Sequence, residues 1–287
     1  MPVLLALVAV TAVWGVTFVQ VKDAVELYPL FAFLAVRFLI ASVVLAVPAV
    51  RRIGGLGRRG WIAGASLGLL LALGYALQTA GLERTTVSSA GFITGLYVVF
   101  TPLLGLLLFR TPVGRAIWLG VALAVLGLAL LSGVGAGDPG GDLLVLLGSA
   151  AYSLQIALME RYAPRYDPLA FTQAEMLAAF AGFAVVTVAL GQVEVPHGWT
   201  VWSALLVTGI FASALGFLVQ TWAQRRISAS RTAIAFAMEP VFAGIFGFWL
   251  AGDRLGVLGW AGCALIMAGI LVAEPDAGRT LRRLVAR

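Results

Sequence analysis

Ten runs of apolar residues, separated by short polar segments, occupy most of the chain. A helix needs about 20 mostly apolar residues to cross the roughly 30 Å hydrocarbon core of a bilayer, because each residue adds about 1.5 Å. The pattern therefore predicts an all-α membrane protein of ten transmembrane helices. The predicted spans are 3–21, 29–50, 61–82, 87–109, 114–132, 141–160, 168–190, 198–223, 228–250 and 256–273.

The composition agrees with lipid as the main solvent. Of 287 residues, 61% are hydrophobic and only 11% are charged, whereas about 25% of a typical soluble domain is charged. A mean hydropathy of +1.02 leaves too little polar surface to cover a water-soluble globule. The net charge of +6 is spread over short clusters between apolar runs, which is typical of membrane loops and not of a nucleic-acid-binding surface.

The basic residues fall mainly on one side of this predicted topology. Ten spans place both termini on the same side, and cytoplasmic connections are enriched in Lys and Arg. If the termini are cytoplasmic, the outer connections hold only Lys22, Arg84 and Arg254. The inner segments hold Arg51, Arg52, Arg58, Arg59, Arg110, Arg115, Arg161, Arg165, Arg225, Arg226, Arg231, Arg279, Arg282, Arg283 and Arg287. We therefore expect a multi-pass protein of the bacterial inner membrane with both termini in the cytoplasm.

The second half of the chain repeats the first. Residues 74–79 (GYALQT) match residues 216–221 (GFLVQT) at an offset of 142 positions, and Thr94 and Pro102 match Thr232 and Pro240 at an offset of 138. The pattern predicts two five-helix repeats, at residues 1–135 and 136–274, followed by a basic cytoplasmic tail at 275–287. Because five is odd, the second repeat enters the membrane from the opposite face, so the two repeats are inverted. Inverted repeats are typical of carriers that open alternately to the two sides.

Several short motifs resemble those of a known family. They are Trp14-Gly15, Arg37-Phe38, the run 90–97 leading to Pro102, Glu239-Pro240 and the loop 252–255. Together they resemble the EamA-type permeases of the drug/metabolite transporter superfamily, over essentially both halves. Members of that family carry amino acids, drugs and other metabolites, so the resemblance implies transport without naming a substrate. Residues 110–112 depart from the family, whose members usually carry an acidic residue there, as this chain does at Asp253 in the second half.

Three ionisable residues lie well inside predicted spans. Arg37, Glu175 and Glu239 occupy the second, seventh and ninth spans, where a charge is costly unless it is paired or faces water. One interpretation is that Arg37 pairs with one of the carboxylates and holds the bundle together. The other assigns to Glu239 the ammonium group of a substrate, or a proton.

Two prolines are expected to kink the helices that line a cavity. Pro240 removes one backbone hydrogen bond and leaves the carbonyl of Phe236 without its helical partner, and Pro102 is its counterpart in the first half. Polar stripes share a helix face with each proline. They consist of Thr94, Tyr97 and Thr101 in the fourth span, and of Thr232, Phe236 and Glu239 in the ninth.

Aromatic and amide side chains at matching positions in the two halves complete a candidate substrate site. A small-molecule site combines an apolar lining with a few fixed polar groups. The remaining candidates are Trp14, Tyr75, Gln78, Tyr152, Gln155, Phe217 and Gln220. Each residue taken alone is equally consistent with packing between helices.

Other functional classes fit the sequence poorly. The single histidine, His197, lies in a predicted outer loop, and no HExxH or GxSxG motif occurs, so we expect neither an enzyme nor a bound metal or cofactor. The single cysteine, Cys263, excludes a disulfide within the chain. We expect a secondary transporter, a monomer or weak homodimer in the lipid bilayer, that exports small-molecule metabolites. Amino acids, aromatic ones included, are the first choice of substrate, and hydrophobic or cationic drugs are the alternative.

Overall fold

The computed structural model describes residues 2–85, 87–132, 138–246 and 256–273. Asp253, Arg254 and the basic tail at 275–287 lie outside this part of the chain. Within it, every regular element is a helix. The elements of the first half are α1 (Pro2–Leu27), α2 (Leu30–Ala49), η1 (Ile53–Leu56), α3 (Gly57–Leu82), α4 (Val87–Gly95), α5 (Tyr97–Phe109) and α6 (Arg115–Ser132).

The second half has more interruptions. Its eighth predicted span consists of an α-helix, a π-helical stretch and another α-helix in succession. The elements are α7 (Pro139–Tyr162), η2 (Ala163–Arg165), α8 (Pro168–Ala189), α9 (Trp199–Leu206), η3 (Val207–Leu215), α10 (Gly216–Gln224), α11 (Ala229–Phe236), α12 (Glu239–Phe246) and α13 (Val257–Ala273).

Six helical segments of the described chain are long and apolar enough to cross a membrane. They are Leu30–Ala49, Ile53–Leu82, Ala90–Phe109, Pro139–Arg165, Pro168–Ala189 and Trp199–Gln224. Three shorter apolar helices accompany them, at Pro2–Thr17, Arg115–Leu130 and Val257–Ala273. Large apolar side chains such as Leu107 (73% exposed) and Val185 (69% exposed) cover the outer surface, as expected of a surface that faces lipid. The protein is therefore a multi-pass membrane protein.

Two of the predicted spans are broken into pairs of helices. α11 ends at Phe236 and α12 begins at Glu239, directly before Pro240, which has no amide hydrogen to donate to the Phe236 carbonyl. In the fourth span the break lies at Leu96, between α4 and α5, whereas α5 continues through Pro102. We expected that interruption at the proline itself. The tight turn around Leu96, in which Val99 N donates to the Leu96 carbonyl at 2.9 Å, replaces it.

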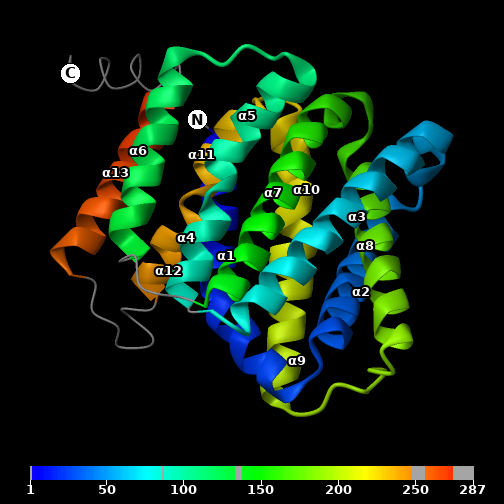
Figure 1. The fold of residues 1–287 in the computed structure, drawn as a ribbon. Coiled ribbons are helices and arrows are strands. Elements are labelled where there is room, and N and C mark those ends of the chain that lie inside the picture. Colours follow the sequence, from blue (N-terminus) through cyan, green and yellow to red (C-terminus); the bar gives the residue numbers. More distant parts are fainter. Residues whose placement is uncertain (1, 86, 133–137, 247–255, 274–287) are drawn as a thin grey trace.

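The helices pack in two groups around a centre (Figure 1). α6 and α13 lie side by side at one edge, and α2, α3 and α8 form the other, with α1, α7 and α10 between them. The backbones of α6 and α13 touch: a Cβ atom on Gly127 would lie 2.6 Å from the Gly262 carbonyl oxygen, and one on Gly269 would lie 2.7 Å from the Gly120 carbonyl oxygen. Small residues at such crossings let membrane helices approach closely.

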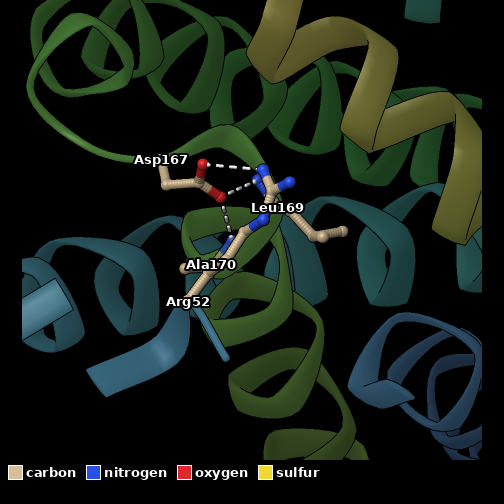
Figure 2. A network of polar contacts seen from close by, with 4 residues as sticks. All are labelled: Arg52, Asp167, Leu169 and Ala170. Carbon is tan, nitrogen blue, oxygen red and sulfur yellow. Dashed lines mark hydrogen bonds and ion pairs between the residues drawn. The ribbon is translucent and has the colours of Figure 1, made fainter. Parts of the chain in front are cut away.

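Acidic side chains begin two helices of the second half. Asp167 Oδ1 accepts hydrogen bonds from the amides of Leu169 and Ala170, at 3.1 and 3.2 Å, and so satisfies two free donors at the start of α8 (Figure 2). Its other oxygen, Oδ2, lies 3.1 Å from Arg52 Nη1. Asp138 caps α7 through the Gly141 amide at 2.7 Å.

Candidate substrate-binding site

A cavity with an empty volume of about 750 Å³ lies where the helices of both halves meet. Its lining comes from α1, α2, α3, α4, α5, α7, α10, α11 and α12. The lining residues are Trp14, Thr17, Val21, Arg37, Leu71, Tyr75, Gln78, Thr79, Leu82, Thr94, Tyr97, Tyr152, Gln155, Ile156, Phe217, Gln220, Phe236 and Glu239.

An aromatic wall forms one part of this cavity. The Trp14 ring lies 4.8 Å from the Phe236 ring and 5.7 Å from the Phe217 ring, centroid to centroid. Tyr75 meets Tyr152 edge to face at 5.4 Å. The Trp14 indole nitrogen donates to the Ala212 carbonyl at 2.8 Å, which fixes the ring. The ring planes are tilted by 41° to 80° to one another, so the wall offers both ring faces and ring edges to a ligand.

Hydrogen bonds between side chains hold the amide groups of the cavity in place. Gln78 Nε2 donates to Thr94 Oγ1 at 2.9 Å, and the Tyr152 hydroxyl donates to Gln78 Oε1 at 3.0 Å. In the second half of the chain, Gln220 Nε2 donates to Gln155 Oε1 at 3.0 Å. These polar groups are ordered before any ligand arrives, which lowers the entropic cost of binding.

Arg37 is the cation of the cavity. Its Nε donates to Ser213 Oγ at 2.8 Å and its Nη2 donates to the Tyr75 hydroxyl at 2.9 Å. The guanidinium carbon lies 4.5 Å from the centroid of the Tyr75 ring. The side chain is only 3% exposed, yet it keeps its charge because arginine does not lose its proton in proteins.

Glu239 is the carboxylate of the cavity. Its Oε2 accepts a long hydrogen bond of 3.5 Å from the Tyr97 hydroxyl, and Arg37 is near enough to interact with it electrostatically. The sequence left open whether Arg37 pairs with Glu175 or with Glu239. The structure contains an ion pair with neither, although all three residues are described. The cavity therefore presents one cation and one carboxylate that do not neutralise each other by direct contact.

Twelve of the fourteen predicted substrate-binding residues line the cavity, and two do not. Thr101 is buried and its hydroxyl has no hydrogen-bond partner in the described structure. Glu175 is fully buried on α8 and accepts a hydrogen bond from Gln155 Nε2 at 2.6 Å, behind the lining. We had expected Glu175 to match Arg37 as a lining residue.

Some residues of the site were missed from sequence. Ser213, which holds Arg37, precedes Phe217 by four residues and Gln220 by seven, so the stripe of those two residues could have led to it. Thr17 follows Trp14 by three residues and was also within reach of that rule. Thr79 also lines the cavity, and as a polar residue of the repeated run 74–79 it too could have been found. The remaining lining residues carried no polar or repeat signal that separates them from packing residues: Val21, Leu71, Leu82 and Ile156.

The fold and the cavity define a multi-pass helical membrane protein with a central cavity lined by aromatic rings, amide groups, one arginine and one glutamate. The sequence profile of the EamA-like transporter family matches this chain twice, over residues 1–133 and 139–273. The chain therefore belongs to the EamA-like transporter family, whose members are transporters in the drug/metabolite transporter superfamily.

Individual relatives agree with this family. An uncharacterized transporter of Archaeoglobus fulgidus is 33% identical over 275 residues, covering 94% of this chain and 85% of the relative. The uncharacterized inner membrane transporter YedA of Escherichia coli K12 is 26% identical over 284 residues, covering 95% and 90%. One solved crystal structure has a TM-score of 0.80 at 20% identity and covers 97% of this chain and 98% of its own, so the two proteins share the fold.

Proposed function

We propose that this protein is a secondary transporter that exports small metabolites, foremost amino acids and among them aromatic ones, by alternating access across the bacterial inner membrane. One observation carries the proposal. Arg37 and Glu239 line the same cavity with no ion pair between them. A free amino acid carries one carboxylate and one ammonium group, so it can neutralise both residues at once.

The partners of the two charged residues favour this arrangement. The arginine is anchored through Nε and Nη2, and a guanidinium has five N–H donors, so donors remain for a substrate carboxylate. Among the described residues, Glu239 accepts a hydrogen bond only from Tyr97, at the long distance of 3.5 Å, which leaves its carboxylate able to accept hydrogen bonds from an ammonium group. The Trp14, Phe217 and Phe236 rings then receive an apolar or aromatic side chain.

We further propose ten spans arranged as two inverted five-helix halves, 1–135 and 136–274. Two pairs of contacts support the inversion. Gly74 packs on the Tyr152 ring and Gly216 packs on Trp14, and these pairs exchange places under the offsets of 142 and 138 in the sequence repeat. Rocking of two such halves opens one central site to either side in turn.

The orientation proposed from the basic residues places both termini in the cytoplasm. The Escherichia coli relative bears the name of an inner membrane transporter, which supports the inner membrane as the location here. The cavity is enclosed by helices of a single chain, so a monomer or a weak homodimer suffices for this mechanism.

Efflux of hydrophobic or cationic drugs is the second candidate. The aromatic wall beside Glu239 favours it, since a lipophilic cation needs a carboxylate and aromatic rings but no arginine. In amino-acid export Arg37 binds the substrate carboxylate, whereas in drug efflux Arg37 has no role in binding the substrate.

Counterflow of labelled substrate into proteoliposomes separates them. Charge-assisted hydrogen bonds are worth about 1.5–3 kcal/mol, so Glu239→Gln should weaken the apparent affinity for an aromatic amino acid by about 10- to 100-fold. Arg37→Gln should weaken it similarly, while leaving the affinity for the matching decarboxylated amine unchanged. Arg226→Gln is the control, because Arg226 is exposed and lies over Trp222. Saturable flux of a lipophilic cation without counterflow of any amino acid would establish the second candidate instead.

A further inference from the structure

Glu175 is a buried acidic residue that the proposed substrate site does not use. It lies in the second turn of α8, is 0% exposed and does not line the cavity. Its Oε1 accepts one hydrogen bond from Gln155 Nε2 at 2.6 Å. Its Oε2 is buried and accepts no hydrogen bond from any described residue.

No described residue around Glu175 supplies a counter-charge. From α3, Gly64 and Gly68 lie against the backbone of Glu175; from α7 comes the Gln155 amide; η1, η3 and α10 contain no ionisable residue. The ionisable residues of α2, α3 and the adjoining α7 turn to other partners or to solvent. On α2, Arg37 donates hydrogen bonds to Ser213 and Tyr75. On α3, Arg58 and Arg59 are exposed. On α7, Tyr152 donates to Gln78, Glu160 accepts from the Ala229 amide, Arg161 lies over the Phe109 ring and Asp142 accepts from Thr85.

A carboxylate in this environment is costly. Burying an ionised carboxyl group without a paired cation costs several kcal/mol, whereas the neutral acid needs only hydrogen bonds. Glu175 therefore holds a proton in the conformation described here. It can release that proton only in a conformation that brings water to Oε2.

We propose that Glu175 is a proton-binding site that couples export of the substrate to entry of a proton. Resting on the proposed transport function, the cycle exchanges one proton for one substrate. The proton passes from water to Oε2 of Glu175, forming an O–H bond, and that bond breaks when the proton returns to water on the other side of the membrane. Substrate charge is handled separately, by Arg37 and Glu239.

A short hydrogen-bonded path links the proton site to the cavity. Gln155 bonds to Glu175 through its nitrogen and accepts from Gln220 through its oxygen, and both glutamines line the cavity. Gln220 also donates to Gln224, whose own nitrogen donates to the Ile156 carbonyl at 2.8 Å. A change of charge on Glu175 therefore changes the strength of its hydrogen bond with Gln155, whose side chain lines the proposed substrate cavity. That contact supplies the coupling between proton and substrate.

The test compares exchange with gradient-driven transport. Glutamine matches the shape of the neutral acid, so Glu175→Gln should retain amino-acid counterflow. Its apparent affinity should stay within about 3-fold of the wild type, which is a change in binding free energy of less than about 1 kcal/mol. The variant should lose accumulation driven by a pH gradient. For one-to-one exchange, a gradient of one pH unit supports about 10-fold accumulation in the wild type. The matched control is Glu194→Gln, an exposed carboxylate that should leave both measurements unchanged.

Each outcome decides the proposal. Accumulation by Glu175→Gln at the wild-type level, or wild-type transport indifferent to the pH gradient, would overturn it; so would loss of counterflow in correctly folded Glu175→Gln. If that variant does not fold, Glu175→Asp takes its place and should keep coupling with a displaced pH midpoint, and an unmoved profile would contradict the proposal. Failure of the proposed amino-acid transport is seen separately, as the absence of amino-acid counterflow in the wild-type protein.

Discussion

Arg37 and Glu175 stand 138 positions apart, at matching places in the two halves, yet they face different surroundings. Arg37, on α2, reaches the cavity and is held by Ser213 and Tyr75. Glu175, on α8, lies behind the lining, with Gln155 as its single hydrogen-bond donor among the described residues. The helices that carry them pack against each other. A repeated scaffold can therefore place opposite charges at matched positions and give them separate tasks.

The contacts that hold the helices together are more alike in the two halves than the polar groups. Gly74 and Gly216 each pack on an aromatic ring of another helix. By contrast, Gln78 bonds Thr94 and Tyr152, whereas its counterpart Gln220 bonds Gln155 and Gln224. The two halves therefore share helix packing, but the hydrogen bonds of their matching polar side chains differ.

The largest effect should come from the shared scaffold at the crossing of α6 and α13. In Gly127→Ala and Gly269→Ala the new methyl group meets a backbone carbonyl at 2.6 or 2.7 Å, which cannot move aside as a side chain would. We expect each change to cost about 3 kcal/mol of folding free energy. The melting temperature in detergent should therefore fall to a similar extent in the two variants. The control is Gly105→Ala, where nothing lies within 4 Å of the added Cβ. A loss at one glycine only would break the equivalence of the halves.

A smaller effect should follow from removing the residue that positions Arg37. Ser213→Ala deletes the acceptor for Arg37 Nε, and a hydrogen bond to a charged group contributes about 1.5–3 kcal/mol. We expect the apparent affinity for an amino acid in counterflow to fall about 10-fold, with little change for the amine. Ser213→Thr keeps the hydroxyl and should restore affinity. Equal losses for amino acid and amine would show that Ser213 does not act through Arg37.

The smallest effect should appear at the start of α8. Asp167 caps this helix, whereas Pro29 stands at the matching position before α2 and forms no side-chain cap. Asp167→Ala should cost about 1 kcal/mol of folding free energy, measured by thermal unfolding. Arg52→Ala should cost less than about 0.5 kcal/mol, because the ion pair it breaks is exposed. If the two variants lost equal stability, the ion pair and not the cap would be the source.

The sequence predicted an all-helical membrane protein because lipid demands long apolar runs. It predicted most of the residues that line the cavity because polar and aromatic residues recur at matching positions of the two halves, such as Gln78 and Gln220. It could not place Glu175 behind the lining. A helix that is apolar all round gives no periodic signal for which face looks inward. The break at Leu96 could not be predicted either, because no proline stands at that position.

The central claim, that one cavity opens alternately to the two sides of the membrane, is tested most directly by the accessibility of a single thiol in it. Thr79 lines the cavity and has no assigned role, so Thr79→Cys in a Cys263→Ala background gives one reporter in proteoliposomes of known orientation. A membrane-impermeant maleimide should label it from either face, and saturating amino acid should slow the labelling from both. Labelling from one face only, with and without substrate, would contradict alternating access.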